Sequence, residues 1–155
     1  MEPLPPFTPE VIERLIVQVP LLKHLTPNER QQVLGFMEAF LRFQPGEVIV
    51  KEGEQDDAAM YILISGRAAV TTGEQGEVIL DEVQVGEFFG ELSFLTESPR
   101  TATVQALEPC IVWRLDHAAL GAMPCSLREK IKDDIIQKLM RVVSHSNQQI
   151  KSVMI

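Results

Sequence analysis

The stretch GEFFGELSFLTESPRTATV, residues 86–104, decides the fold and points to the site. Gly90, Glu91 and Ser93 open a short apolar turn, and Arg100 follows at the entry to an alternating run that is typical of a β-strand. Glycines leave backbone N–H groups uncovered, the start of a helical turn carries a partial positive charge, and arginine offers a two-pronged donor to phosphate. The stretch therefore predicts a site for a small anionic ligand.

Glu91 is unusual in such a site, because a carboxylate repels phosphate unless it faces another part of the ligand. A ribose hydroxyl is its natural partner. Taken singly, Glu91 is more often a surface carboxylate and Arg100 a surface ion-pair partner. The inference of a nucleotide site therefore depends on the two residues standing together inside one motif.

The motif resembles the phosphate-binding cassette of the cyclic nucleotide-binding domain family. The resemblance extends upstream from the cassette to a strand-turn-strand signature, and covers the chain from about residue 20 to residue 116. The matching segments are residues 89–92, 99–102, 103–106, 43–49, 52–54 and 60–66.

The resemblance implies a mainly β fold: a jelly-roll-like double-stranded β-helix of about eight strands, with N-terminal helices and a long C-terminal helix. It also implies a function, which is to bind cAMP or cGMP and to couple occupancy to movement of the C-terminal helix. The expected ligand-binding residues are Gly90, Glu91, Leu92, Ser93, Arg100, Thr101 and Val70.

Each expected site residue has a role in this resemblance. Arg100 pairs with the cyclic phosphate, and Glu91 accepts from the ribose 2′-hydroxyl. Backbone N–H groups from Gly90, Leu92, Ser93 and Thr101 surround the phosphate. Ser93 stands where the family commonly has alanine, and its N–H performs the same task. A base pocket lined by Val70 is the weakest element, because β-branched residues in strands are more often plain core; the same holds for Phe88, Phe89 and Val83.

Thr101 bears on the choice of base. In this family, alanine directly after the arginine is associated with cAMP, whereas threonine is associated with acceptance of cGMP. Both nucleotides therefore remain open as ligands.

The segments around the cassette divide into helices and short strands. Apolar spacing predicts a helix from Val11 to Pro20 and a second one after Thr26, with Val33, Leu34, Phe36, Met37 and Phe40 on its apolar face. Short β-rich runs separated by glycines predict strands at residues 48–50, 60–64, 68–72, 78–83, 101–107 and 110–115. We expect an irregular tail over residues 1–10, the binding domain with its N-terminal helices over residues 11–123, and a C-terminal helix over residues 124–155.

The C-terminal helix carries an apolar stripe of Leu127, Ile131, Ile135, Leu139 and Val142, and is expected to run to about Gln149. A stripe of this length exceeds what one small sheet covers. The sequence therefore predicts a homodimer through this helix, or a signalling contact with an effector protein that the sequence does not identify.

Composition excludes several other functions. A formal net charge of −8 argues against nucleic acid, and few residues follow Asp116 beyond the long helix, so we expect no DNA binding. No apolar stretch approaches the roughly 20 residues that span a bilayer, which favours a cytoplasmic protein without a membrane partner.

Catalytic and metal chemistry have no signature in the sequence. Cys110 and Cys125 lack paired spacing, and His24, His117 and His145 lie far apart without other ligands at metal-site spacing. We expect neither a metal nor an enzyme. The alternative to a nucleotide sensor is a module that keeps the fold for structure or protein interaction and binds no ligand.

Overall fold

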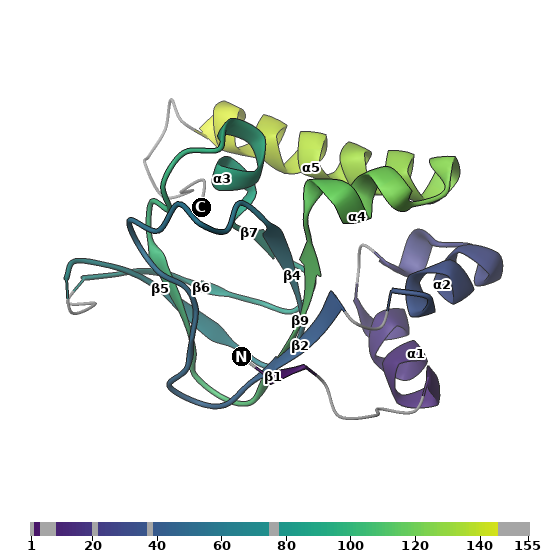
Figure 1. Ribbon diagram of the computed structural model, residues 1–155, viewed down its shortest axis with the longest axis horizontal. Helices are drawn as coiled ribbons and strands as arrows, with labels where there is room; N and C mark the ends of the chain where they lie inside the picture. The colour runs from purple at the N-terminus through teal and green to yellow at the C-terminus, as the bar shows by residue number, and fades with distance from the viewer. Residues whose placement is uncertain (1, 4–8, 20–21, 37–38, 75–77, 146–155) are drawn as a thin grey trace.

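The computed structural model describes residues 2–3, 9–19, 22–36, 39–74 and 78–145. In Figure 1 the strands gather on one side, α1 and α2 lie on the other, and α5 crosses above the sheets and α3. In chain order the elements are β1 (Glu2–Pro3), α1 (Pro9–Gln18), the 3₁₀ turn η1 (Leu22–His24), α2 (Pro27–Leu34), β2 (Phe40–Phe43), β3 (Val48–Val50), β4 (Met60–Ser65), β5 (Ala68–Thr72), β6 (Val78–Val83), β7 (Phe88–Phe89), α3 (Glu91–Thr96), β8 (Thr103–Ala106), β9 (Cys110–Leu115), α4 (His117–Ala122) and α5 (Cys125–His145).

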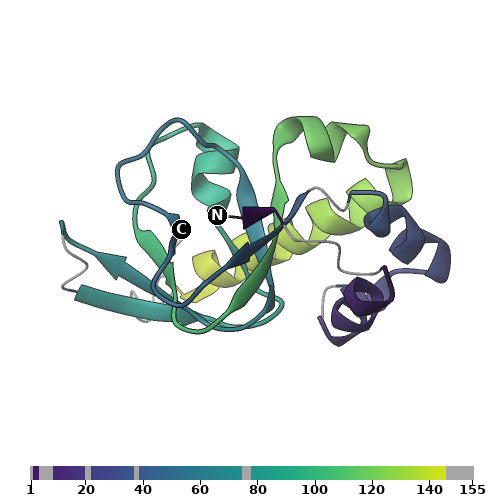
Figure 2. The same ribbon diagram turned by 60° about the horizontal axis from the view of Figure 1, so that its bottom comes forward.

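The strands form two antiparallel sheets, ordered β1-β2-β9-β4-β7 and β3-β8-β5-β6. Figure 2, which brings the lower edge forward, shows the two sheets wrapping around a common interior. The predicted mainly β jelly-roll fold with flanking helices is confirmed. Each of the six predicted strands is present, although the strand expected over residues 101–107 is shorter, at Thr103–Ala106.

Three strands were not predicted, and the reasons are local. The expectation of an irregular segment over residues 1–10 is wrong for Glu2–Pro3, which pair with Leu41 and Arg42 of β2. Strand β2 itself begins at Phe40, a residue assigned from its spacing to a helix face. Strand β7 has only two residues, too few for a period to be read.

Helix α2 begins as predicted and ends earlier. Thr26 and Glu29 form a reciprocal capping box, with the Thr26 side chain accepting from the Glu29 N–H and the Glu29 side chain accepting from the Thr26 N–H. The helix stops at Leu34, and the Gly35 N–H donates back to the carbonyls of Gln32 and Val33. Phe40 therefore lies on β2 and not on the helix, and its ring stacks on that of Trp113 of β9, with the centroids 5.6 Å apart. Met37 lies outside the described residues.

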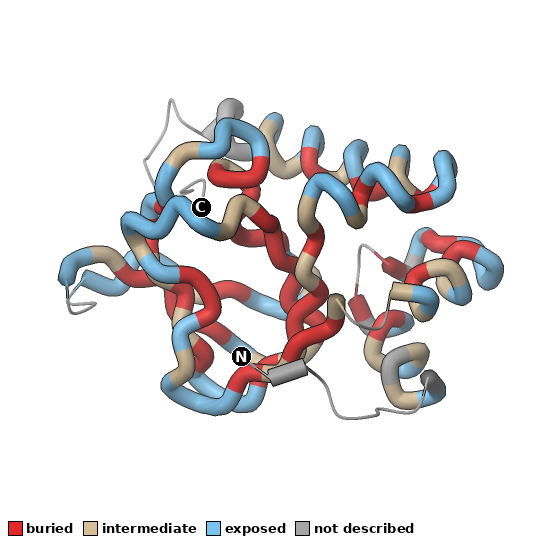
Figure 3. The backbone as a smooth tube through the Cα atoms, in the orientation of Figure 1, coloured by how far each residue is buried: buried red, intermediate tan, exposed pale blue. Residues whose placement is uncertain are grey.

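Alternation along the central strands creates two cores, one on each face of the larger sheet. Met60, Ile62 and Trp113 face the helices, whereas Tyr61 and Leu63 face the second sheet. Figure 3 shows buried residues running along these strands and along the inner sides of the helices. The cassette contributes to both cores. Phe94 of α3 belongs to the core on the helix side, and Phe89 of β7 belongs to the core between the sheets.

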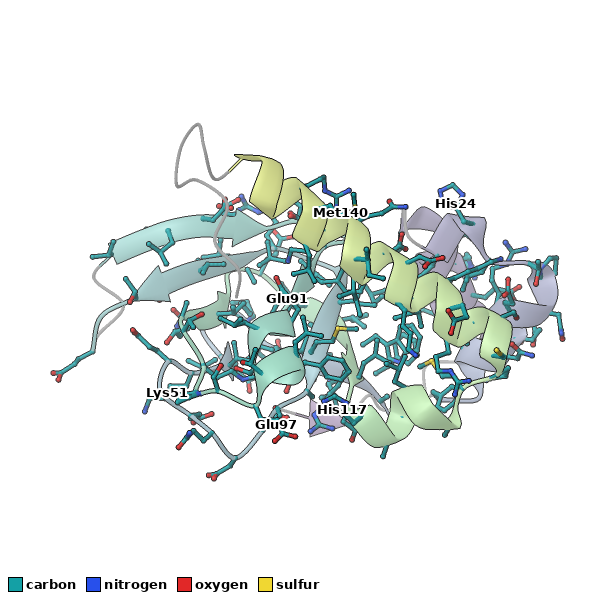
Figure 4. All side chains as sticks on the ribbon, turned by 90° about the horizontal axis from the view of Figure 1, so that it is seen from above. His24, Lys51, Glu91, Glu97, His117 and Met140 are labelled. Carbon is teal, nitrogen blue, oxygen red and sulfur yellow. The ribbon has the colours of Figure 1, made fainter. Side chains whose placement is uncertain are left out.

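Most of the apolar stripe of α5 is buried in the core of the domain. Leu127, Ile131 and Ile135 are buried in the helix-side core, and Leu139 packs against it. The argument that the stripe exceeds what one domain can cover is therefore wrong for these residues; the side chain of Val142 lies outside the described part. Among the side chains of α5 that the structure describes, the exposed large apolar residues are Ile136 and Met140, the latter labelled in Figure 4.

A charged contact fastens α5 to the N-terminal helices. The Lys130 ammonium lies 2.5 Å from Glu29 Oε1 and donates to the His24 carbonyl at 3.0 Å. Burial by itself raises the pKa of Glu29, but hydrogen bonds from Lys130 and from the Thr26 N–H outweigh it and lower the pKa from 4.5 to about 2. Glu29 is therefore a charged carboxylate in the folded protein.

We expect Glu29→Gln to lower the free energy of unfolding at neutral pH by about 1 to 3 kcal/mol, because charged hydrogen bonds are lost. The folded-state pKa lies below the unfolded one, so the contribution of Glu29 is complete above pH 4.5 and disappears as pH falls towards 2. Denaturant unfolding of both proteins across this range should show the difference shrinking with acidity. Glu129→Gln, which removes an exposed ion pair on α5, is the control. A difference that does not vary with pH would contradict the assignment.

Candidate functional site

The cassette is built on a sharp turn between β7 and α3. Gly90 occupies the N-cap position of α3 with φ of 80°, in the left-handed region that side chains other than glycine disfavour. Its carbonyl accepts from the Phe94 N–H at 3.2 Å and so closes the first helical turn. The N–H groups of the first three helical residues have no acceptor within a helix of this geometry. The turn therefore presents backbone donors at the place where the phosphate is expected.

Arg100 reaches this turn from the loop before β8 and is buried, with 4% of its surface exposed. Its guanidinium donates from Nη1 to the Gly90 carbonyl at 3.1 Å and from Nη2 to the Ala59 carbonyl at 2.7 Å. It also lies above the Tyr61 ring, with 5.9 Å from the guanidinium carbon to the ring centroid. The charge of Arg100 is thus fixed beside the first turn of α3 by contacts with two segments, residues 59–61 and Gly90.

Gly90 and Arg100 fit each other closely. A Cβ atom at position 90 would stand 2.7 Å from Arg100 Nη1 and 3.2 Å from the Ala59 carbonyl oxygen. The missing side chain therefore serves two purposes, since it permits the positive φ and leaves room for the guanidinium.

Glu91 is the first residue of α3, and 1% of its surface is exposed. Its Oε1 atom lies 2.9 Å from the ammonium of Lys138, which is on α5. Lys138 also donates to the Phe88 carbonyl at 2.5 Å. Figure 4 shows Glu91 beside α5, on the α3 turn. A buried carboxylate is costly unless a positive charge accompanies it, and Lys138 supplies that charge from a distant part of the chain.

The structure brings together the predicted residues Gly90, Glu91, Ser93 and Arg100, all of them buried. Leu92 is partly buried, and Thr101, in the loop before β8, is exposed. Val70 lies on β5 in the core between the sheets, and its packing is that of a core residue. A role for Val70 beside the base stays a prediction, as do the ligand contacts of the other six residues.

Sequence reasoning missed four residues around this site: Asp57, Tyr61, Arg114 and Lys138. Asp57 accepts from the Tyr61 hydroxyl at 2.5 Å and from Arg114 at 2.8 Å, and lies 3.5 Å from Arg100. A lone aspartate in a loop and an arginine in a strand have no pattern of their own. Lys138 belongs to a row of polar residues on α5, and only the fold distinguishes it from its neighbours.

His117 joins the cassette to α4. Its ring stacks on Phe94 with centroids 4.0 Å apart, and its Nε2 atom lies 2.7 Å from the Phe94 carbonyl oxygen. Asp116 caps α4 by accepting from the Ala119 N–H at 2.7 Å. Helix α3 therefore contacts α4 through Phe94 and α5 through Glu91, its first residue.

The described residues lack two other kinds of site. They contain no group of three or more His, Cys, Asp or Glu side chains arranged to hold a metal ion. No helix in the same part of the chain is long and apolar enough to cross a membrane.

Both the sequence and the fold match known proteins. The sequence profile of the family described as "Cyclic nucleotide-binding domain" matches residues 40–123, which include the whole cassette. The chain belongs to the cyclic nucleotide-binding domain family.

Relatives of this chain include a kinase regulatory subunit and a kinase. The chain is 42% identical over 94 residues to a cAMP-dependent protein kinase regulatory subunit of Hypocrea atroviridis, covering 61% of this chain and 19% of that protein. It is 48% identical over 69 residues to a cGMP-dependent protein kinase of Eimeria tenella, covering 44% and 6% respectively. The chain thus spans a small part of the curated relatives that it matches.

A solved structure supports the same relationship. The structure of Sp-2Cl-cAMPS bound to PKAR CBD2 superposes with a TM-score of 0.66 at 27% identity and covers 90% of each chain. The chain is therefore related to the cyclic nucleotide-binding domains of protein kinase A regulatory subunits.

Proposed function

We propose that this chain is a cyclic nucleotide sensor, which binds cAMP or cGMP at the α3 turn and converts occupancy into a movement of α5. The observation that carries the proposal is the burial of Glu91 and Arg100 together at this turn. Paired burial of an acidic and a basic residue that do not neutralise each other suits a ligand with a ribose at one end and a phosphate at the other. The named relatives, a regulatory subunit of a cAMP-dependent protein kinase and a cGMP-dependent protein kinase, support the same ligand class.

Arg100 is assigned to the cyclic phosphate. Its two known donations to carbonyls use one N–H from each of two nitrogens, and a guanidinium has five N–H donors. Arg100 therefore has the capacity to bind phosphate while it keeps its carbonyl contacts. The N–H groups at Gly90, Leu92, Ser93 and Thr101 complete the phosphate site in this proposal.

Glu91 is assigned to the ribose 2′-hydroxyl, and Lys138 gives this assignment a consequence. A hydroxyl that donates to Glu91 shares the carboxylate with the Lys138 ammonium, now 2.9 Å away. The bond between α3 and α5 is then weakened or redirected. Occupancy of the ribose site thereby acts on α5 directly.

Isothermal titration calorimetry with cAMP, cGMP and 2′-deoxy-cAMP tests the proposal. We expect saturable binding of the two ribonucleotides and at least about tenfold weaker binding of the deoxy analogue, because Glu91 loses its donor. Absence of heat with either ribonucleotide at millimolar concentration would instead favour the alternative function, a structural or interaction module without a ligand.

Thr101 is proposed to read the base. We expect Thr101→Ala to weaken cGMP more than cAMP by about 0.5 to 1.5 kcal/mol, because the hydroxyl is an acceptor for the guanine 2-amino group when the base lies over the phosphate. Competition binding of both nucleotides to wild type and variant measures the difference. Equal losses would show that Thr101 serves the phosphate and reads no base.

The proposal also covers the domain organisation, the partners and the location of the protein. Residues 11–123 would act as the binding domain and residues 124–155 as the signalling helix, in a non-catalytic cytoplasmic protein that acts on an unidentified effector. A two-fold dimer through α5 also stays a prediction. The apolar surface available to it on the described residues is Ile136 and Met140, and light scattering would give the mass.

A further inference from the structure

Asp57 stands between two arginines: Arg100, from the loop before β8, and Arg114, from strand β9. Its Oδ2 atom accepts from the Tyr61 hydroxyl at 2.5 Å and lies 3.5 Å from Arg100 Nη2. Its Oδ1 atom accepts from Arg114 Nη2 at 2.8 Å and from the Ala59 N–H at 3.0 Å. The Asp57 carboxylate therefore lies beside Arg100, the residue expected to bind the phosphate, on one side and beside the guanidinium of Arg114 on the other.

Arg114 is placed for this contact by the sheet. It lies on β9 opposite Tyr61 of β4 in the antiparallel register. Its other terminal nitrogen, Nη1, lies 3.3 Å from Asp116 Oδ2, and Asp116 caps α4. Two carboxylates thus hold the guanidinium of Arg114 at a fixed orientation.

The protonation states favour a charged network. Burial raises the pKa of Asp57, but hydrogen bonds from Tyr61, Ala59 and Arg114 outweigh it and hold that pKa below its ordinary value. Burial, followed by the Asp57 carboxylate, raises the pKa of Tyr61, so the phenol stays protonated and donates. Asp57 is a carboxylate, and on its own it would offset the positive charge of Arg100.

We propose that Arg114 is a positioning residue for nucleotide binding, which acts through Asp57 on Arg100. Arg114 takes the closer contact with Asp57, at 2.8 Å against 3.5 Å for Arg100. It thereby balances the carboxylate and leaves the charge of Arg100 directed at the α3 turn. Without Arg114, Asp57 draws the Arg100 guanidinium towards itself and away from phosphate. This inference rests on the proposed function.

The test compares Arg114→Met, Arg114→Lys and the double variant Arg114→Met with Asp57→Asn. Calorimetry with cAMP and cGMP should show about tenfold weaker binding to Arg114→Met and near wild-type binding to Arg114→Lys, which keeps the charge. The double variant should regain most of the lost affinity, because the unbalanced carboxylate is gone. A purely structural role for Arg114 would not be rescued by a second substitution.

Controls separate the possible failures. Arg67→Met removes a half-exposed arginine whose partners are Glu82 and Glu108, and it should bind like the wild type. Fluorescence of Trp113 reports whether each variant is folded; if Arg114→Met is not, Arg114→Gln replaces it. Unchanged affinity in folded Arg114→Met, or no recovery in the double variant, overturns the role of Arg114 while wild-type binding upholds the proposed function. No binding by the wild type overturns both.

Discussion

Replacing Arg100 by Ala is expected to weaken the binding of cAMP or cGMP by about 2 to 5 kcal/mol, the largest effect of any single substitution in this site. The guanidinium is a buried positive charge beside the α3 turn, and its charged hydrogen bonds to the phosphate are lost in the variant. Removing it also leaves the Gly90 and Ala59 carbonyls without their donor. Calorimetric titration of the variant and the wild type measures the loss.

Arg67→Ala is the matched control for Arg100→Ala. Its side chain is 51% exposed and forms only surface ion pairs, whose worth is about 1 kcal/mol or less. We expect its nucleotide affinity to equal that of the wild type. Arg100→Ala binding as tightly as Arg67→Ala would remove Arg100 from the site.

Gly90→Ala should reduce both stability and nucleotide affinity. The left-handed conformation costs alanine about 1 to 2 kcal/mol, and the new Cβ atom would meet Arg100 Nη1 at 2.7 Å. The guanidinium then has to leave its position beside the α3 turn, so we expect about tenfold or greater loss of affinity in addition to the loss of stability. Trp113 fluorescence during denaturation and calorimetry give the two quantities.

Gly46→Ala separates backbone strain from the clash. Gly46 has φ of 90°, and a Cβ atom there meets nothing within 4 Å. The variant should show a comparable loss of stability from strain, with unchanged nucleotide affinity. Equal affinity losses at positions 46 and 90 would mean that strain, and not the displacement of Arg100, weakens the site.

The sequence was sufficient where the determinants are local. The start of the second helix after Thr26 and the glycine-bounded strands each depend on residues close together in the chain, and both are present in the structure. The cassette was predictable for the same reason, since Gly90 and Arg100 lie in one short stretch.

Contacts between segments that lie far apart in the chain could not be predicted from the sequence. Lys138 reaches Glu91 from another helix, and Asp57 meets Arg114 only because β4 and β9 pair. We expected the apolar stripe of α5 to exceed what one domain covers, and this was wrong for Leu127, Ile131 and Ile135, which share one core with residues of α1, α2 and the larger sheet. Packing partners of that kind are a property of the whole fold, whereas periodicity reports only which side of a helix is apolar.

The central claim is that nucleotide at the cassette acts on α5 through Glu91 and Lys138, and hydrogen–deuterium exchange tests it most directly. Amide exchange is followed with and without cAMP or cGMP in wild type, in Lys138→Met and in the control Lys132→Met, whose side chain is 47% exposed. We predict slower exchange at residues 90–101 in all three proteins. The same ligand should change exchange at residues 135–141 of α5 in wild type and in Lys132→Met, and much less in Lys138→Met. Protection of the cassette with no change along α5 in the wild type, or with an equal change in Lys138→Met, would contradict the claim.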